Sequence, residues 1–209
     1  MRALPRRLAT SVLAVDANER MTVLAGLLLL PLLGVEMFTL LSVRRMLPIH
    51  IAVGLWLVPL VAVKMASTGY RMVMYYVRNH DYFSAGPPAL LPRLLAPIVV
   101  ASTVALFGSG IILWAAGPAA RDPWLSIHKV SFVFWASFTG VHVLIHLRRT
   151  LADGLAEIGS SGQGRNARKG LAMGALLVGL VVGVVGAGRG PAWPVGAGDE
   201  QLPANSGQP

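Results

Sequence analysis

Five apolar runs, each long enough to cross a lipid bilayer as a helix, place the strongest constraint on this 209-residue chain. They cover residues 21–43, 47–67, 94–117, 125–147 and 170–187, close to the roughly 17 to 25 residues that a transmembrane helix needs. With 55% hydrophobic and 13% charged residues, the composition favours one compact unit of several spans over a soluble domain. We therefore expect an all-α integral membrane protein, in which four helices form a bundle and the fifth lies at its periphery.

The positive charges are distributed unevenly about these runs and predict the orientation of the chain. Of the 18 Lys and Arg residues, 12 precede the first run or lie in the segments after the second and fourth, and five lie on the alternate side, counting Lys129 near the start of the fourth run; Lys64 is set aside because it lies deep inside a run. Because cytoplasmic segments carry the excess of Lys and Arg, we expect the N-terminus in the cytoplasm and the C-terminus outside a bacterial cytoplasmic membrane. The net charge of +9 then reflects topology and attraction to anionic membrane lipid, and nucleic-acid binding is not expected.

This orientation divides the chain into five parts. We expect a cytoplasmic N-terminal segment at 1–20, a four-span bundle at 21–150, a cytoplasmic linker at 151–169, the fifth span at 170–187, and an extracytoplasmic tail at 188–209. The tail is rich in Pro and Gly, a composition typical of disorder. The second and fourth spans run in the same direction in this topology, so corresponding positions along them lie at equal depth.

The second and fourth spans carry ionisable residues at the same spacing. His50 is followed fourteen positions later by Lys64, and His128 is followed fourteen positions later by His142. Fourteen helical residues bring the members of each pair to one face of their helix, about 21 Å apart along its axis. Ionisable residues at such depths are costly and indicate a function. We expect His50 to face His128 at the outer level, and Lys64 to face His142 at the inner level.

Imidazoles at matched depths on two parallel helices can hold one porphyrin near each membrane face, and haem is the explanation that we favour. The sequence contains no cysteine, which excludes iron–sulfur ligation and covalent attachment of haem. We expect a haem-binding bundle in which His50 and His128 are the axial ligands of an outward-facing haem b. Gly54, one turn below His50, would leave room for the macrocycle. The simpler alternatives are hydrogen bonding between helices for the histidines and close helix packing for the glycine.

We also expect a second haem at the inner level. His142 would supply one ligand and Lys64 the other, because burial in a low-dielectric site favours the neutral amine that can bind iron. In the alternative, Lys64 extends to the headgroups or pairs with a haem propionate. His146 lies one turn from His142, so the two cannot bind opposite sides of one iron. A propionate partner or an interfacial residue is expected at His146.

Two further polar features leave their roles open. Glu36, in the outer half of the first span, is suited to accept a proton from a quinol or to form a structural ion pair with Arg44 or Arg45. The third span contains a notch of small residues at Gly108, Ser109 and Gly110. Close helix packing explains this notch at least as well as contact with a cofactor.

Three segments of the chain resemble bacterial di-haem b-type membrane cytochromes. The segments are HIAVGLWLVPLVAVKMASTGYRMVMYY, SAGPPALLPRLLAP and IHKVSFVFWASFTGVHVLIH, and they look like the five-span cytochrome that accompanies an extracytoplasmic molybdopterin oxidoreductase domain. The resemblance covers roughly residues 45–150 and implies haem-site roles for His50, His128 and His142. Lys64 stands where a four-histidine pattern has its remaining ligand.

The function that this resemblance implies is electron transfer through haem. The chain would connect a membrane quinone pool or redox partner with an extracytoplasmic oxidoreductase, as the electron-transfer subunit of that complex. A quinone-reactive or ferric-reducing cytochrome with its own substrate site is the nearest alternative. A histidine-based metal-ion or proton transporter is an alternative from a different class. A simple membrane anchor leaves the matched histidines unexplained, and the sequence carries no catalytic triad, nucleotide-binding loop or zinc motif with the usual spacing.

Overall fold

Helices make up all the regular structure of the part of the chain that is described. The computed structural model describes residues 6–84, 86, 89–159 and 164–189. The element order is α1 (Arg6–Thr39), η1 (Leu40–Ser42), α2 (Val43–Tyr76), α3 (His80–Ser84), α4 (Leu90–Ala116), η2 (Gly117–Ala120), α5 (Arg121–Gly159) and α6 (Arg165–Arg189), where η1 and η2 are short 3₁₀ helices. No strand occurs among these residues, which confirms the expected all-α fold.

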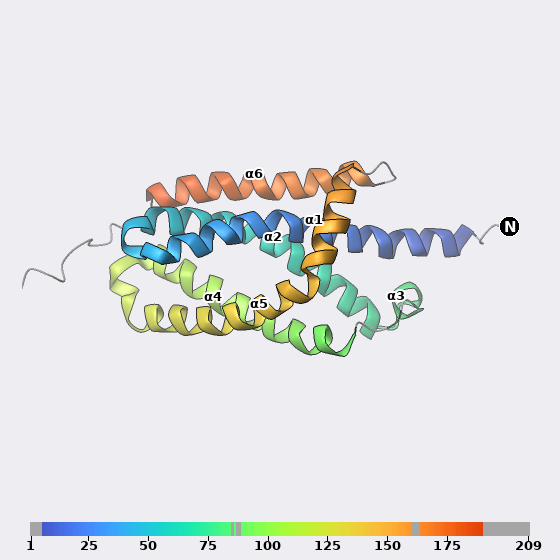
Figure 1. Ribbon diagram of the computed structural model, residues 1–209, viewed down its shortest axis with the longest axis horizontal. Helices are drawn as coiled ribbons and strands as arrows, with labels where there is room; N and C mark the ends of the chain where they lie inside the picture. The colour runs from blue at the N-terminus through green and yellow to red at the C-terminus, as the bar shows by residue number, and fades with distance from the viewer. Residues whose placement is uncertain (1–5, 85, 87–88, 160–163, 190–209) are drawn as a thin grey trace, which may run out of the picture.

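Four helical stretches of the described chain are long and apolar enough to cross a membrane. They are Val15–Tyr76, Leu90–Ala119, Arg121–Gly159 and Arg165–Arg189. The first stretch is a hairpin, because the chain reverses direction at η1 and α2 runs back beside α1 (Figure 1). All five expected spans fall within these stretches, and the arrangement is consistent with a multi-pass membrane protein.

The long helices run alternately between two ends of the bundle (Figure 1). The turns η1 and η2 and the last residues of α6 lie at one end, which we call the η end. Helix α3, the last residues of α5 and the first residues of α6 lie towards the other, which we call the α3 end. Helices α2 and α5 both run from the η end to the α3 end. The two spans that carry the matched ionisable residues are therefore parallel, as expected.

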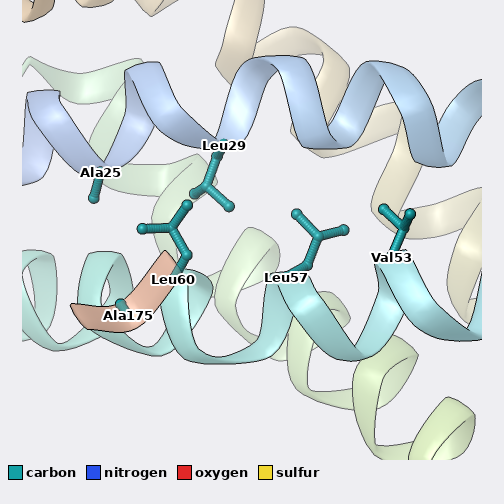
Figure 2. Packing of buried hydrophobic residues seen from close by; sticks show 6 residues of the cluster. All are labelled: Ala25, Leu29, Val53, Leu57, Leu60 and Ala175. Atoms are coloured by element: carbon teal, nitrogen blue, oxygen red, sulfur yellow. The ribbon is translucent and has the colours of Figure 1, made fainter. Parts of the chain in front are cut away.

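The main apolar core lies between α1, α2 and α6. Figure 2 shows its buried residues: Ala25 and Leu29 of α1, Val53, Leu57 and Leu60 of α2, and Ala175 of α6. Leu57 and Leu60 are almost completely buried. Since lipid tails are as apolar as leucine, close packing of this kind is a principal source of helix association in a membrane.

Helices α4 and α5 form a second hairpin, joined by η2. The buried Trp135 of α5 donates from Nε1 to Oγ1 of Thr103 on α4 at 3.1 Å, a polar contact of the kind that links membrane helices. Helix α5 also packs against α1, whereas the backbones of α2 and α5 do not contact each other among the described residues. Residues on α2 and α5 therefore meet only through their side chains.

Helix α6 packs against α2 through small residues. Its buried positions are Ala172, Ala175, Gly179, Gly183 and Gly186. A Cβ on Gly183 would collide with the carbonyl oxygen of Ala52, so the two helices approach as closely as only glycine permits. Helix α6 lies at the edge of the bundle, as expected (Figure 1), and it still contributes Ala175 to the core.

Ion pairs connect α1, α5 and α6 towards the α3 end. Glu157 of α5 is 2% exposed and accepts hydrogen bonds from Arg20 at 3.1 Å and from Arg168 at 2.7 Å. Glu19 of α1 pairs with Arg149 of α5. The last turns of α5 bend towards α6 (Figure 1), which brings Glu157 between the two arginines.

The helices extend into three of the segments expected outside the spans. The segment expected to be a linker, 151–169, is helical up to Gly159 and again from Arg165, because α5 continues beyond its apolar run to place Glu157 in the ion-pair cluster. Helix α1 begins at Arg6, inside the expected N-terminal segment 1–20. The expected tail at 188–209 begins within α6, and its residues 190–209 lie outside the described residues.

Candidate functional site

Two side chains of α1 contact the ring of His50 on α2 and fix its orientation. Because the chain reverses at η1, the last turn of α1 lies beside the start of α2. Nδ1 of His50 is 2.8 Å from Oε1 of Glu36 and 3.0 Å from Oγ1 of Thr39. Thr39 donates its hydroxyl proton to the carbonyl oxygen of Glu36 at 2.6 Å, so its oxygen can only accept from His50. We therefore assign the proton of His50 to Nδ1, which leaves the lone pair of the neutral ring on Nε2.

His128 on α5 is held from α4 in the same manner. Its Nδ1 lies 3.1 Å from the carbonyl oxygen of Leu106 and 3.1 Å from Oγ of Ser109. A carbonyl oxygen can only accept a hydrogen bond, so Nδ1 of His128 also carries the proton. Gly110 permits this approach, since a Cβ there would lie 3.1 Å from Cε1 of the ring. The lone pair of His128 is thus also on Nε2.

The rings of His50 and His128 meet across the space between α2 and α5. Their centroids are 6.3 Å apart and their planes are inclined by 82°. Two imidazoles on opposite sides of one metal ion have centroids roughly 6.4 Å apart, given a metal–nitrogen bond of about 2.0 Å and about 1.2 Å from the nitrogen to the ring centre. Neither Nε2 has a hydrogen-bond partner in the described part of the chain. The pair therefore has the donor atoms and the separation that fit the two axial positions of a haem iron.

Lys64 and His142, expected to face each other nearer the α3 end, are not joined. Lys64 donates from Nζ to the carbonyl oxygen of Thr22 on α1 at 3.1 Å. A Cβ on Gly26 of α1 would lie 3.0 Å from the same Nζ, so the amine points towards α1. No hydrogen bond links Lys64 to His142 within the described residues. Ligation of iron by Lys64 stays a prediction.

His142 and His146 lie together on α5. Their ring centroids are 4.7 Å apart, shorter than the separation of ligands on opposite sides of a metal, as expected for neighbours one turn apart. Nδ1 of His142 and Oγ1 of Thr139 are buried without a hydrogen-bond partner among the described residues, although buried polar atoms usually have one. No group of three or more His, Asp or Glu side chains that would hold a metal ion occurs in that part of the chain. The haem-related roles of His142 and His146 stay predictions.

Glu36 of α1 pairs with a residue of the site, His50 of α2. The alternative of a structural pair with Arg44 or Arg45 is not found among the described residues. Proton acceptance from a quinol stays a prediction. Gly54 faces the same carboxylate, because a Cβ there would lie 3.6 Å from Oε1 of Glu36. Its role in leaving room for a macrocycle also stays a prediction.

The residues that hold the two histidine rings are largely missed by sequence reasoning. Nothing in the sequence singles out Thr39 or the carbonyl of Leu106, because the turn at η1 and the packing of α4 on α5 decide what they face. Ser109 and Gly110 belong to the notch of small residues in the third span. A hydroxyl within that notch is the one signal that favours contact with a polar ring over simple packing.

Comparisons of the chain with known protein families, with curated proteins and with solved structures find no match.

Proposed function

We propose that this chain is a b-type membrane cytochrome in which His50 and His128 are the axial ligands of one haem b. The observation that carries the proposal is the pairing of the two rings at 6.3 Å, each held through Nδ1. Histidines that bind metals commonly donate their other ring N–H to a carboxylate or a backbone carbonyl. Glu36 and Leu106 take these two roles here.

The arrangement of the chain's own residues favours electron transfer over oxygen chemistry. Haem b supplies one-electron oxidation and reduction when bound. His50 and His128 would fill both axial positions and leave none for oxygen. The buried Thr39 and Ser109 hold the ring orientations, because each accepts from Nδ1.

The partners follow from the orientation that we infer from the positive charges. In a bacterial cytoplasmic membrane with the N-terminus inside, the η end faces outwards, towards an extracytoplasmic oxidoreductase. Arg44, Arg45 and Arg121 are exposed at this end, and none forms an ion pair with the described residues. Three such guanidinium groups would attract an acidic docking surface. A membrane quinone is the second electron carrier that we expect.

The haem content of the purified protein tests the proposal. We expect the parent protein to carry low-spin haem b, and His50→Ala and His128→Ala each to lose this spectrum, because each variant lacks an axial ligand. His80→Ala is the matched control, since the His80 side chain is 80% exposed and lies on α3. Unchanged low-spin haem in both ligand variants would overturn the proposal. Colourless protein that binds zinc would favour the metal-ion transporter instead.

The same measurement decides whether a second haem lies nearer the α3 end. Two haems per chain in the parent and one in both His142→Ala and Lys64→Ala would support ligation by these two residues. One haem in the parent would leave Lys64 with the structural role that its hydrogen bond to Thr22 describes.

A further inference from the structure

The groups that hold the two histidine rings differ in charge. Nδ1 of His128 faces only neutral acceptors, the Leu106 carbonyl and the Ser109 hydroxyl. Nδ1 of His50 faces the carboxylate of Glu36 in addition to a hydroxyl. One side of the proposed haem site is therefore supported by an acidic side chain, and the other side is not.

No cation offsets Glu36 in the described structure. The Glu36 side chain is 13% exposed, its Oε2 is buried without a hydrogen-bond partner among the described residues, and no Lys or Arg of that part of the chain forms an ion pair with it. An acidic residue within a membrane span is costly and indicates a function. No arginine pairs with Glu36 among the described residues, so the function of Glu36 is not to neutralise an arginine.

We propose that Glu36 positions His50 and makes it the more electron-rich of the two axial ligands. The reduction potential of the bound haem would then be lower than in a site where both histidines donate to neutral acceptors. A histidine that donates its other N–H to a carboxylate is a more basic ligand, and a more basic ligand stabilises oxidised iron relative to reduced iron. A nearby negative charge acts in the same direction, and its effect is larger where the dielectric constant is low. This inference rests on the proposed function, because it requires His50 to be a haem ligand.

A potentiometric titration of the purified full chain, followed through the haem spectrum, tests this role. Glu36→Gln removes the charge but keeps the shape and a side-chain oxygen, so we expect the midpoint potential to rise. Glu36→Asp keeps the charge, and we expect its potential to stay closer to that of the parent. Glu19→Gln is the matched control, because it makes the same substitution on the same helix towards the α3 end, where Glu19 pairs with Arg71 and Arg149. Its potential should equal that of the parent.

The possible results separate this inference from the proposed function. A parent protein without haem overturns both. A parent with haem whose potential is unchanged in Glu36→Gln overturns the inference alone, as does an equal rise in Glu19→Gln. If Glu36→Gln binds no haem, two other variants provide the test. Glu36→Asp must retain haem. Ser109→Asp adds a carboxylate beside His128, and it must lower the reduction potential of the haem. Failure of either expectation overturns the inference.

Discussion

Gly183 on α6 is the position where one added carbon should disturb helix packing most clearly. A Cβ at Gly183 would collide with the carbonyl oxygen of Ala52 on α2 and would lie 3.3 Å from Cβ of Trp56. The nearest obstacle is backbone, which cannot rotate away as the end of a side chain can. In Gly183→Ala, α6 must therefore move away from α2.

The expected change in the free energy of unfolding follows from three contributions. Overpacking a tight contact costs about 1–3 kcal/mol. Displacement of α6 also stretches two hydrogen bonds to its backbone. The Trp56 indole donates to the carbonyl of Leu176 at 2.9 Å, and the Trp114 indole donates to the carbonyl of Gly186 at 2.8 Å. The loss of one of these hydrogen bonds costs about 1 kcal/mol. Replacement of glycine by alanine within a helix stabilises it by about 1 kcal/mol. We expect Gly183→Ala to be destabilised by about 1–3 kcal/mol in total.

Gly174→Ala on the same helix is the control, because nothing lies within 4 Å of a Cβ at that position among the described residues. It should show only the helix-propensity gain and unfold at a slightly higher temperature than the parent. Thermal unfolding in detergent, followed by circular dichroism and tryptophan fluorescence, compares the variants. If Gly183→Ala unfolds at or above the temperature of Gly174→Ala, the close approach of α6 to α2 is refuted.

Two further predictions concern the ends of the bundle. Glu157→Gln removes the buried carboxylate that pairs with Arg20 and Arg168, and we expect the free energy of unfolding to fall by about 3 kcal/mol. This value is at the lower end for a buried pair because the Arg20 side chain is 45% exposed. Asp153→Asn removes an exposed partner of Arg149 and should cost at most about 1 kcal/mol, so equal unfolding temperatures of these two variants would contradict the buried cluster. A topology reporter fused after α6 should be extracytoplasmic, and activity of a cytoplasmic reporter at that position would invert the proposed orientation.

The course of the helices follows from local properties of the sequence. Apolar runs of membrane length form helices in lipid because their backbone N–H and C=O groups find no other partners there, and each expected span falls within one of the four long helical stretches. Short turns such as η1 and η2 make consecutive spans antiparallel, so the second and fourth are parallel. Parallel direction and equal spacing then bring His50 and His128 to the same level, as their ring contact shows.

The polar partners within the bundle could not be predicted in this way. Arg44 and Arg45 are close to Glu36 in the sequence, but the hairpin at η1 aligns Glu36 with His50 instead. Lys64 shares its register with His142, yet α1 lies against Lys64 and offers it a carbonyl oxygen. Spacing along one helix specifies depth and face, but it does not specify which neighbouring helix that face meets.

The sequence by itself determined the helical class, the parallel second and fourth spans, and the common level of His50 and His128. These properties depend on the transfer of single residues into lipid and on the helical repeat, both of which are local. Only the tertiary structure decided how each helix is rotated about its axis and which helix it packs against. That rotation placed a carboxylate of α1 on His50, a carbonyl of α4 on His128 and the glycines of α6 on α2. It depends on the simultaneous packing of side chains from several helices, and no single span contains that information.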